Sequence, residues 1–170
     1  MLYKTRKLCD NGSRDKRKKE MDNTDVRILE CLRKNARINA SDIADKVNLS
    51  ASTVSDRIRK LETSGIIRGY TVVLDPQKLN KDIMALITVA IEDPKFNEGF
   101  ENAVKVNPDI TECFYIAGSF DYLLKVITDN TKSLESVLNY IKGIAGVGKT
   151  VTNIVLNVCK NEHSISVVSD

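Results

Sequence analysis

The side chains best suited to contact a polyanion are concentrated between Ser50 and Lys60, where hydroxyl groups are followed by basic groups. Arginine and lysine attract the phosphates of a nucleic acid, and short hydroxyl side chains at the start of a helix can approach phosphates and base edges closely. This stretch therefore predicts a DNA-contacting surface. Its candidate residues are Ser50, Ser52, Thr53, Ser55, Asp56, Arg57, Arg59 and Lys60.

Helical spacing divides this stretch into an apolar and an outward face. Val54, Ile58 and Leu61 recur at i, i+4 and i+7, which is the spacing of an apolar stripe. At about 100° per residue, the side chains that point away from this stripe are those of Ser52, Asp56, Arg59 and Thr63. A polar outward face is also expected of a helix pair that is simply solvated, so that alternative stays open at this point.

Two charged residues of this helix have more than one interpretation. Arg57 projects near the apolar stripe, so packing or a contact to the DNA backbone suits it as well as base readout does. Asp56 would be repelled by phosphates, yet it could accept a hydrogen bond from a cytosine amino group. Spacing alone does not choose between these roles.

The helix that carries these residues is the second of a closely spaced pair. In the first helix, Ile43, Ala44 and Val47 fall on one face. Two helices joined by a turn of a few residues form a helix-turn-helix. The residues that mark its boundaries are Asn39 or Ser41 as the first N-cap, Asn48-Leu49 as the turn, Ser50 as the second N-cap and Gly65 as the C′ residue.

The neighbouring segments extend this pair to a winged helix-turn-helix. An earlier helix is predicted over residues 22–35, with Asn23 or Thr24 as its cap. After the pair, the run of β-branched residues at 66–74 predicts a strand. Three helices followed by a strand make a winged helix-turn-helix, which we place at residues 21–74.

A second domain with a different order of elements follows a hinge at residues 75–82. The order β-α-β-β-α-β is typical of the ferredoxin-like fold. The sequence therefore predicts an α+β protein whose residues 83–170 form a ferredoxin-like domain. Its strands are predicted at residues 84–91, 110–117, 122–127 and 151–159, and its helices at residues 94–104 and from Thr131 or Ser133 to Ile141.

Charge is distributed unevenly along the 170 residues. Residues 1–20 carry eight basic and three acidic side chains, a net charge of +5, and are predicted to be a disordered basic arm or a start-site extension. Residues 21–70 carry nine basic and seven acidic side chains, a net charge of +2. Residues 71–170 carry nine basic and thirteen acidic side chains, a net charge of −4. Positive charge thus lies on the side of the helix-turn-helix, as DNA binding requires.

Several classes of function find no support in the composition. The four cysteines form no CxxC pair and His163 is the only histidine, so neither a zinc site nor a His-based catalytic triad is indicated. We expect no metal and no cofactor. No apolar run is long enough to span a bilayer, and the N-terminus lacks the apolar core of a signal peptide. These patterns point to a cytoplasmic protein with no membrane partner.

The segment from Gly143 to Thr150 matches the phosphate-binding pattern G-x-x-x-x-G-K-[ST]. Such a loop works because it follows a strand and opens a helix, whose N-terminal N–H groups bind the phosphates. Here a predicted helix precedes the loop and a predicted strand follows it. We therefore interpret the segment as a helix-to-strand connection and predict that the protein is not an enzyme, with ATP hydrolysis as the alternative to exclude.

Motifs along the chain occur in a specific order: Asp25–Leu29, Leu49–Glu62, Gly65–Tyr70, Gly118–Leu124, and the Gly146-Val147 turn with Thr150-Val-Thr152. Together they sample nearly all of the chain except residues 1–20. In this order they resemble the Lrp/AsnC regulators, also called feast/famine regulatory proteins. The resemblance implies a winged helix-turn-helix joined to a ligand-sensing βαββαβ domain, which pairs with a second copy through its sheet.

The resemblance also implies dimers that assemble into tetramers or octamers, with an amino acid or a related metabolite bound between dimers. A carboxylate can pair with the α-amino group of such an effector, while hydroxyls and turn N–H groups can hold its α-carboxylate. A hairpin turn with Asp121 as a surface cap is the alternative. Ser119 stands where family members often have an acid, which bears on ligand choice. By position, the effector-binding residues are Gly118, Asp121, Tyr122, Thr150 and Thr152.

We therefore predict a sequence-specific, DNA-binding transcriptional regulator whose oligomeric state or DNA binding responds to an amino acid or a related metabolite. A two-fold homodimer would require a roughly palindromic double-stranded DNA site. The alternative is an architectural protein that wraps DNA with little sequence specificity, for which oligomerisation and a basic arm would suffice.

Overall fold

The computed structural model describes residues 21–162 and 164–167, so the predicted arm at residues 1–20 and His163 lie outside the described residues. The chain divides into two compact units. One unit extends to Thr71 and also contains the described residues from Glu162 onward, and the other spans Val72–Asn161. The domain boundaries expected at residues 74 and 82 stay predictions.

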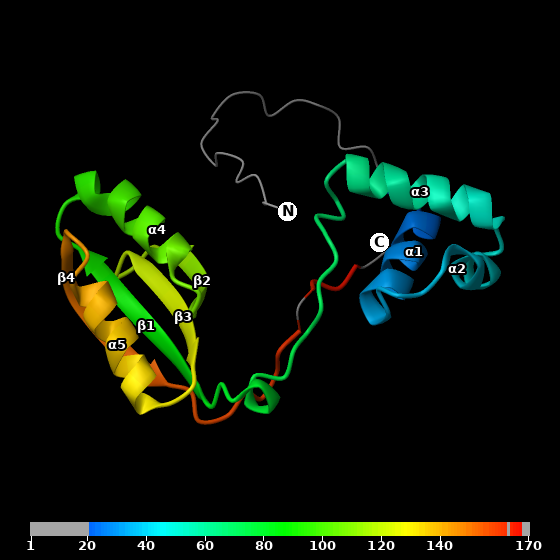
Figure 1. Ribbon diagram of the computed structural model, residues 1–170. Helices are drawn as coiled ribbons and strands as arrows, with labels where there is room; N and C mark the ends of the chain where they lie inside the picture. The colour runs from blue at the N-terminus through cyan, green and yellow to red at the C-terminus, as the bar shows by residue number, and fades with distance from the viewer. Residues whose placement is uncertain (1–20, 163, 168–170) are drawn as a thin grey trace. The chain divides into compact units, whose positions relative to one another are not determined.

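Three helices form the first unit, and they are coloured blue to cyan in Figure 1. Their inward faces meet around Ile28, Ile43 and Val54, whose side chains are fully buried. For α2 and α3 this core is the one that the helical spacing predicts, because residues three and four apart lie on the same side of a helix. The helices are α1 (Asn23–Lys34), α2 (Ala40–Val47) and α3 (Ala51–Thr63).

The helix-turn-helix has the caps and the turn that the sequence predicts. Asn39 accepts a hydrogen bond from the backbone N–H of Asp42 at 2.7 Å, and Ser50 accepts one from the N–H of Thr53 at 3.2 Å. Between the helices, Asn48 adopts the left-handed conformation with φ 57°. Asparagine tolerates this conformation better than most residues, so it makes a tight turn at little cost.

The cap predicted for α1 is wrong. Asp22 is the N-cap, and its carboxylate accepts a hydrogen bond from the N–H of Asp25 at 2.8 Å. Asn23 and Thr24 already lie inside the helix. A side chain can reach the unpaired N–H groups of the first turn only from the last residue with extended backbone, and that residue is Asp22.

The strand predicted over residues 66–74 is also absent among the described residues, although Gly65 ends α3 with φ 77° as expected. A strand requires a neighbouring strand that accepts and donates ladder hydrogen bonds. No described segment pairs with this run, and most of its apolar side chains are exposed, with Val72 at 77% and Leu74 at 63%. The β-branched composition therefore indicates an extended segment, but composition cannot specify a second strand that would pair with it.

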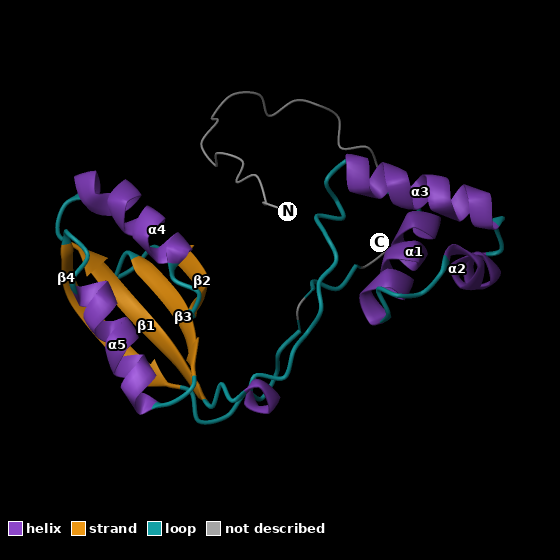
Figure 2. Cartoon of the chain, viewed as in Figure 1, coloured by secondary structure: helices purple, strands orange, loops and turns teal. Residues whose placement is uncertain are grey.

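The second unit is a four-stranded antiparallel sheet with two helices on one face, as Figure 2 shows. The strands lie in the order β2-β3-β1-β4. This arrangement confirms the predicted ferredoxin-like fold, so the protein is α+β. Its elements are β1 (Ile83–Ile91), a short 3-10 turn (Pro94–Phe96), α4 (Asn97–Val106), β2 (Ile110–Tyr115), β3 (Tyr122–Thr128), α5 (Thr131–Lys142) and β4 (Val147–Ile154).

The last strand begins and ends earlier than predicted. β4 was placed at residues 151–159, but its first residue is Val147, which pairs with Ile91 at the end of β1. Its last ladder residue is Ile154, opposite Ala85. Because an edge strand extends only as far as its neighbour, the limits of β1 set those of β4. β2 is likewise shorter than predicted and ends at Tyr115.

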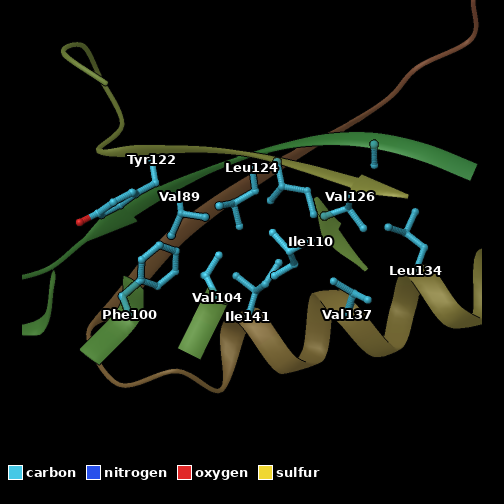
Figure 3. Close-up of a cluster of buried hydrophobic side chains, with 12 residues drawn as sticks. Val89, Phe100, Val104, Ile110, Tyr122, Leu124, Val126, Leu134, Val137 and Ile141 are labelled. Carbon is cyan, nitrogen blue, oxygen red and sulfur yellow. The ribbon is translucent and has the colours of Figure 1, made fainter. Parts of the chain in front are cut away.

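The core of the second unit lies between the sheet and its helices (Figure 3). Alternate residues of β1 and β3, such as Val89 and Leu124, point toward the helices and are fully buried. Phe100 from α4 and Ile141 from α5 pack against them. The period of two along the strands and the helical spacing of the apolar residues together account for this single apolar layer.

A glycine closes the connection between α5 and β4. Gly146 has φ 84°, and a Cβ atom at this position would overlap the ring of Phe96. Its carbonyl accepts a hydrogen bond from the N–H of Glu92 at 2.9 Å. A residue with a side chain would therefore be strained by its backbone conformation and would clash with the ring.

Two features are absent from residues 21–162 and 164–167. No helix in this part of the chain is both long and apolar enough to cross a membrane. No group of three or more histidine, cysteine, aspartate or glutamate side chains in the same part could hold a metal ion.

Candidate functional site

The outward face of α3 has the orientation that helical angles predict. Val54 and Leu61 are buried against α1 and α2, whereas Ser52, Asp56 and Arg59 are exposed. The structure therefore presents a polar helix surface in the position of the second helix of a helix-turn-helix. In that motif the second helix enters the major groove of DNA.

The hydroxyl groups of α3 are bonded within the helix. Ser50 Oγ lies 2.9 Å from Ser52 Oγ and 2.8 Å from Thr53 Oγ1, so three hydroxyls form one cluster at the helix N-terminus. Ser55 Oγ donates to the carbonyl of Ala51 at 2.9 Å. These bonds fix the hydroxyl positions, while the remaining lone pairs and N–H groups stay available to a phosphate.

Three charged side chains on α3 behave differently. Asp56, Arg59 and Lys60 are exposed, and none of them has a hydrogen bond or ion pair to any described residue. Their charges are therefore free to act on a binding partner. The structure thus divides the predicted DNA-contacting residues into an internally bonded group of hydroxyls and a free group of charges.

Arg57 belongs to neither group, because it joins α3 to α1. Its Nη1 atom lies 2.7 Å from Oδ2 of Asp22 and 2.8 Å from Oδ1 of Asp25. The side chain is 28% exposed, and that of Asp25 is 19% exposed. Arg57 is thus engaged within the protein, and its predicted contact with DNA stays a prediction. The sequence interpretation that packing suits it as well as readout agrees with this position.

This ion pair shifts the pKa values of both Asp22 and Arg57. The pKa of Asp22 is held below its ordinary value of 3.8, first by the N–H of Asp25 and then by the Arg57 guanidinium. The two carboxylates in turn raise the pKa of Arg57. Sequence reasoning missed this cluster, since Arg57 follows its partners by more than thirty positions. The only local signal is the pair of acids at i and i+3 that opens α1.

The second candidate site lies at the end of the sheet, around the turn between β2 and β3. Asp121 is built into the sheet: its carboxylate accepts from the N–H of Ile91 at 2.7 Å, and its own N–H donates to the carbonyl of Val89 at 2.9 Å. Gly118 is exposed at the turn, needs no positive φ, and no described atom lies within 4 Å of where its Cβ would be. The turn is therefore held rigidly by Asp121 and left open at Gly118.

Tyr122 is placed under this turn rather than at its surface. The side chain is 1% exposed and its ring packs against Phe100 and Tyr115, at centroid distances of 4.7 and 5.1 Å. Its hydroxyl donates to Glu101 at 3.1 Å. Burial and the neighbouring Glu101 carboxylate raise the pKa of Tyr122, so the hydroxyl stays protonated. Glu101 was not singled out from the sequence, which offers no local signal for this contact.

The register of the sheet shows where Thr150 and Thr152 lie relative to the turn between β2 and β3. Val89 of β1 pairs with Tyr122 on one side and with Thr150 on the other, so all three lie on the helix-facing side of the sheet. Two strand spacings, about 10 Å, separate Tyr122 from Thr150. Thr152 lies one row further along the same side and, like Thr150, is half-buried. The five predicted effector residues thus gather at one end of the sheet, with only Tyr122 fully covered.

The segment that matches a phosphate-binding loop has the geometry of a helix-to-strand connection. α5 ends at Lys142, and Lys149 and Thr150 lie within β4. A strand follows the glycines instead of a helix, so no helix N-terminus faces a phosphate there. The match of letters therefore has no matching structure.

Comparison with known proteins gives the same two-part organisation. Residues 21–68 match the winged helix-turn-helix DNA-binding family, and residues 83–165 match the Lrp/AsnC ligand binding domain. The class of protein that fold and site define is therefore a DNA-binding transcriptional regulator with a ligand-binding domain.

Individual relatives narrow this class to one family. The HTH-type transcriptional regulator FL11 of Pyrococcus furiosus is 33% identical over 147 residues, which cover 86% of this chain and 97% of the relative. Among solved structures, Escherichia coli AsnC has a TM-score of 0.80 at 28% identity, with 86% of this chain and 99% of that chain covered. A regulator from Neisseria meningitidis in complex with L-Met has a TM-score of 0.82 at 30% identity, over 86% of this chain and 96% of that chain. The chain belongs to the Lrp/AsnC family of transcriptional regulators.

Proposed function

We propose that this regulator binds double-stranded DNA through the outward face of α3 and that an amino acid or a related metabolite, bound near the Gly118 turn, changes its DNA binding or its oligomeric state. The observation that carries the DNA-binding part is the pair of exposed cations on α3, Arg59 and Lys60, which have no partner among the described residues. Such a regulator acts where the DNA is, in the cytoplasm. The N. meningitidis structure was solved with L-Met, which supports an amino acid as the effector.

A homo-oligomer is part of this proposal. The sheet face opposite the helices carries a row of residues that the register aligns across all four strands: Phe114, Leu123, Thr88 and Val151. Phe114 is 48% exposed and Val151 38% exposed in the single chain. A largely apolar sheet face suits packing against the same face of a second copy. We propose a homodimer formed in this way, which assembles into tetramers or octamers.

Replacement of Arg59 by alanine tests the assignment of the DNA-contacting face. Arg59 has no partner within the described chain, so Arg59→Ala is expected to leave the melting temperature unchanged. Loss of a phosphate or base contact should weaken DNA binding by about 10- to 100-fold, or about 1–3 kcal/mol. Fluorescence anisotropy with labelled operator DNA at fixed salt measures this loss of affinity.

Lys142→Ala, which removes an exposed positive charge on α5, is the matched control and should bind within about two-fold of the wild type. Equal affinity of Arg59→Ala and wild type would reject this face.

Replacement of Gly118 by alanine or valine tests the effector site. Neither backbone conformation nor a neighbour within the unit explains a glycine at this position, whereas a ligand approaching the turn would. We expect a screen of the standard amino acids to find one that raises the melting temperature, because a ligand that binds only the folded state stabilises it. In Gly118→Val that rise should fall by more than about half, while the unliganded melting temperature changes by less than about 2 °C.

Gly99→Ala, on the exposed side of α4, is the matched control and should retain the full ligand-induced rise in melting temperature. An unchanged response in Gly118→Val would place the ligand elsewhere.

A further inference from the structure

Asp56 is an acidic side chain in the middle of a surface that otherwise suits a polyanion. On α3 it lies with Ser52 and Arg59 on the side directly opposite the buried Val54 and Leu61. It is exposed and has no hydrogen bond or ion pair to any described residue. In the proposed complex this carboxylate would therefore face the DNA without a neutralising partner among the described residues.

The helix offers partners that Asp56 does not use. Arg59 and Lys60 follow at i+3 and i+4, the two spacings at which opposite charges on a helix can pair. The adjacent Arg57 is instead paired with Asp22 and Asp25 of α1. The unpaired state of Asp56 is thus a property of this arrangement, which keeps one anionic acceptor and one cationic donor, Arg59, side by side on the outward face.

A free carboxylate near phosphates is unfavourable unless it finds a donor in the groove. In the major groove, guanine and thymine present only acceptors or a methyl group. Adenine presents an amino group beside the acceptor N7, which repels a carboxylate. Cytosine presents its N4 amino group as a donor without an adjacent acceptor, so cytosine is the base that an aspartate recognises best.

The neighbouring Arg59 fits the next base pair along the groove. Side chains at i and i+3 have Cβ atoms about 5–6 Å apart, and successive bases are about 3.4 Å apart along a strand. Arginine binds the O6 and N7 atoms of guanine. An aspartate and an arginine at this spacing are therefore complementary to a cytosine and a guanine.

We propose that Asp56 determines the sequence specificity of this regulator by accepting a hydrogen bond from the N4 amino group of a cytosine in each half-site, beside a guanine that Arg59 binds. The inference rests on the proposed function, since it requires α3 to lie in the major groove. In a two-fold dimer the two cytosines are related by symmetry and lie about one helical turn, or a multiple of it, apart.

The experiment starts with selection of binding sites from randomised duplex DNA by the full chain and by Asp56→Ala. The selected site is then compared with a variant in which the C·G pair of one half-site is changed to T·A, at one fixed salt concentration. Wild type should prefer the C·G site by about 5- to 150-fold, the range of a single good base contact. Asp56→Ala should bind the two sites within about two-fold of each other, because the acceptor is gone. Asp45→Ala, which removes an exposed carboxylate from α2, is the matched control and should retain the preference.

Each possible result has a defined meaning. If Asp56→Ala keeps the full preference for C·G and binds every sequence more tightly, the carboxylate only repels DNA and the inference is wrong. If wild type selects a site without a symmetric cytosine, the inference is also wrong while the proposed function stands. If wild type selects no sequence at all, the proposed sequence-specific regulation fails together with this inference. Because Asp56 is exposed and unpaired, its replacement should leave the melting temperature unchanged, which thermal unfolding verifies.

Discussion

Gly146→Ala is expected to lower the free energy of unfolding of the second unit by about 2–4 kcal/mol. A non-glycine residue with a left-handed backbone costs about 1 kcal/mol or more, and overfilling a packed site adds about 1–3 kcal/mol. Both terms apply, because Gly146 has φ 84° and an added Cβ would overlap the ring of Phe96. Urea unfolding followed by circular dichroism measures the change.

Two variants separate the terms of this prediction. Phe96→Ala removes the ring that the added Cβ would overlap. Gly146→Ala should therefore lower the free energy of unfolding by less in a Phe96→Ala protein than in the wild type. Gly99→Ala is the matched glycine control: Gly99 lies within α4 and no described atom lies within 4 Å of its Cβ position. That substitution should raise stability by about 0.5–1 kcal/mol, since alanine favours a helix over glycine. The same effect for both glycines would contradict the account of Gly146.

The second large effect is expected for Arg57→Ala. This substitution removes the ion pairs that join α3 to α1 and leaves Asp25, 19% exposed, without its charged partner. We expect a loss of about 1–2 kcal/mol in the free energy of unfolding of the first unit, mostly from Asp25, because Asp22 is 52% exposed and its pair is screened by solvent. DNA binding should weaken as well, since this contact holds α3 against α1 and thereby positions the outward face of α3.

The comparison with Arg59→Ala shows which role each arginine has. Arg57→Ala should lower both stability and DNA affinity, whereas Arg59→Ala should lower affinity alone. A double-mutant cycle of Arg57→Ala with Asp25→Asn measures the coupling between the two residues, which should be about 0.5–2 kcal/mol. If Arg57→Ala unfolds at the same urea concentration as wild type but loses DNA binding, Arg57 contacts DNA directly and the ion pair contributes nothing.

The same cluster predicts a dependence on acid. The folded-state pKa of Asp22 is lowered from 3.8, so its contribution to stability is present above pH 3.8 and is lost as the pH falls through the lowered value. Wild type should therefore lose stability in this acid range more steeply than Arg57→Ala does. Unfolding curves of both proteins between neutral pH and about pH 3 provide the measurement.

The agreement between sequence and structure is greatest where the signal is local. Val54 and Leu61 of α3 are buried where their spacing places them, and Ser50 and Asn39 cap the helices that they precede. In the second unit β1 and β3 lie where the sequence predicts strands, and their side chains alternate between buried and half-buried. These features depend on residues within one or two turns of each other, so the order of the chain alone specifies them.

Agreement fails where a partner from elsewhere in the chain sets the outcome. The run at 66–74 has the composition of a strand but no pairing segment among the described residues, and the length of β4 follows that of β1. The cap of α1 shows that even a local signal can be misread by one residue, because Asp22, Asn23 and Thr24 are all good caps and only backbone conformation distinguishes them.

The sequence by itself determined the two-part organisation, the fold class, the family, and the helix that carries the proposed DNA-contacting face. Only the tertiary structure decided how the charged residues of that helix divide: Arg57 binds Asp22 and Asp25 on α1, whereas Asp56 and Arg59 have no partner among the described residues. It likewise placed Tyr122 beneath the turn and bonded Asp121 to β1. The physical reason is that periodicity is a property of neighbouring residues, while an ion pair or a buried hydroxyl depends on two elements that meet only when the chain is folded.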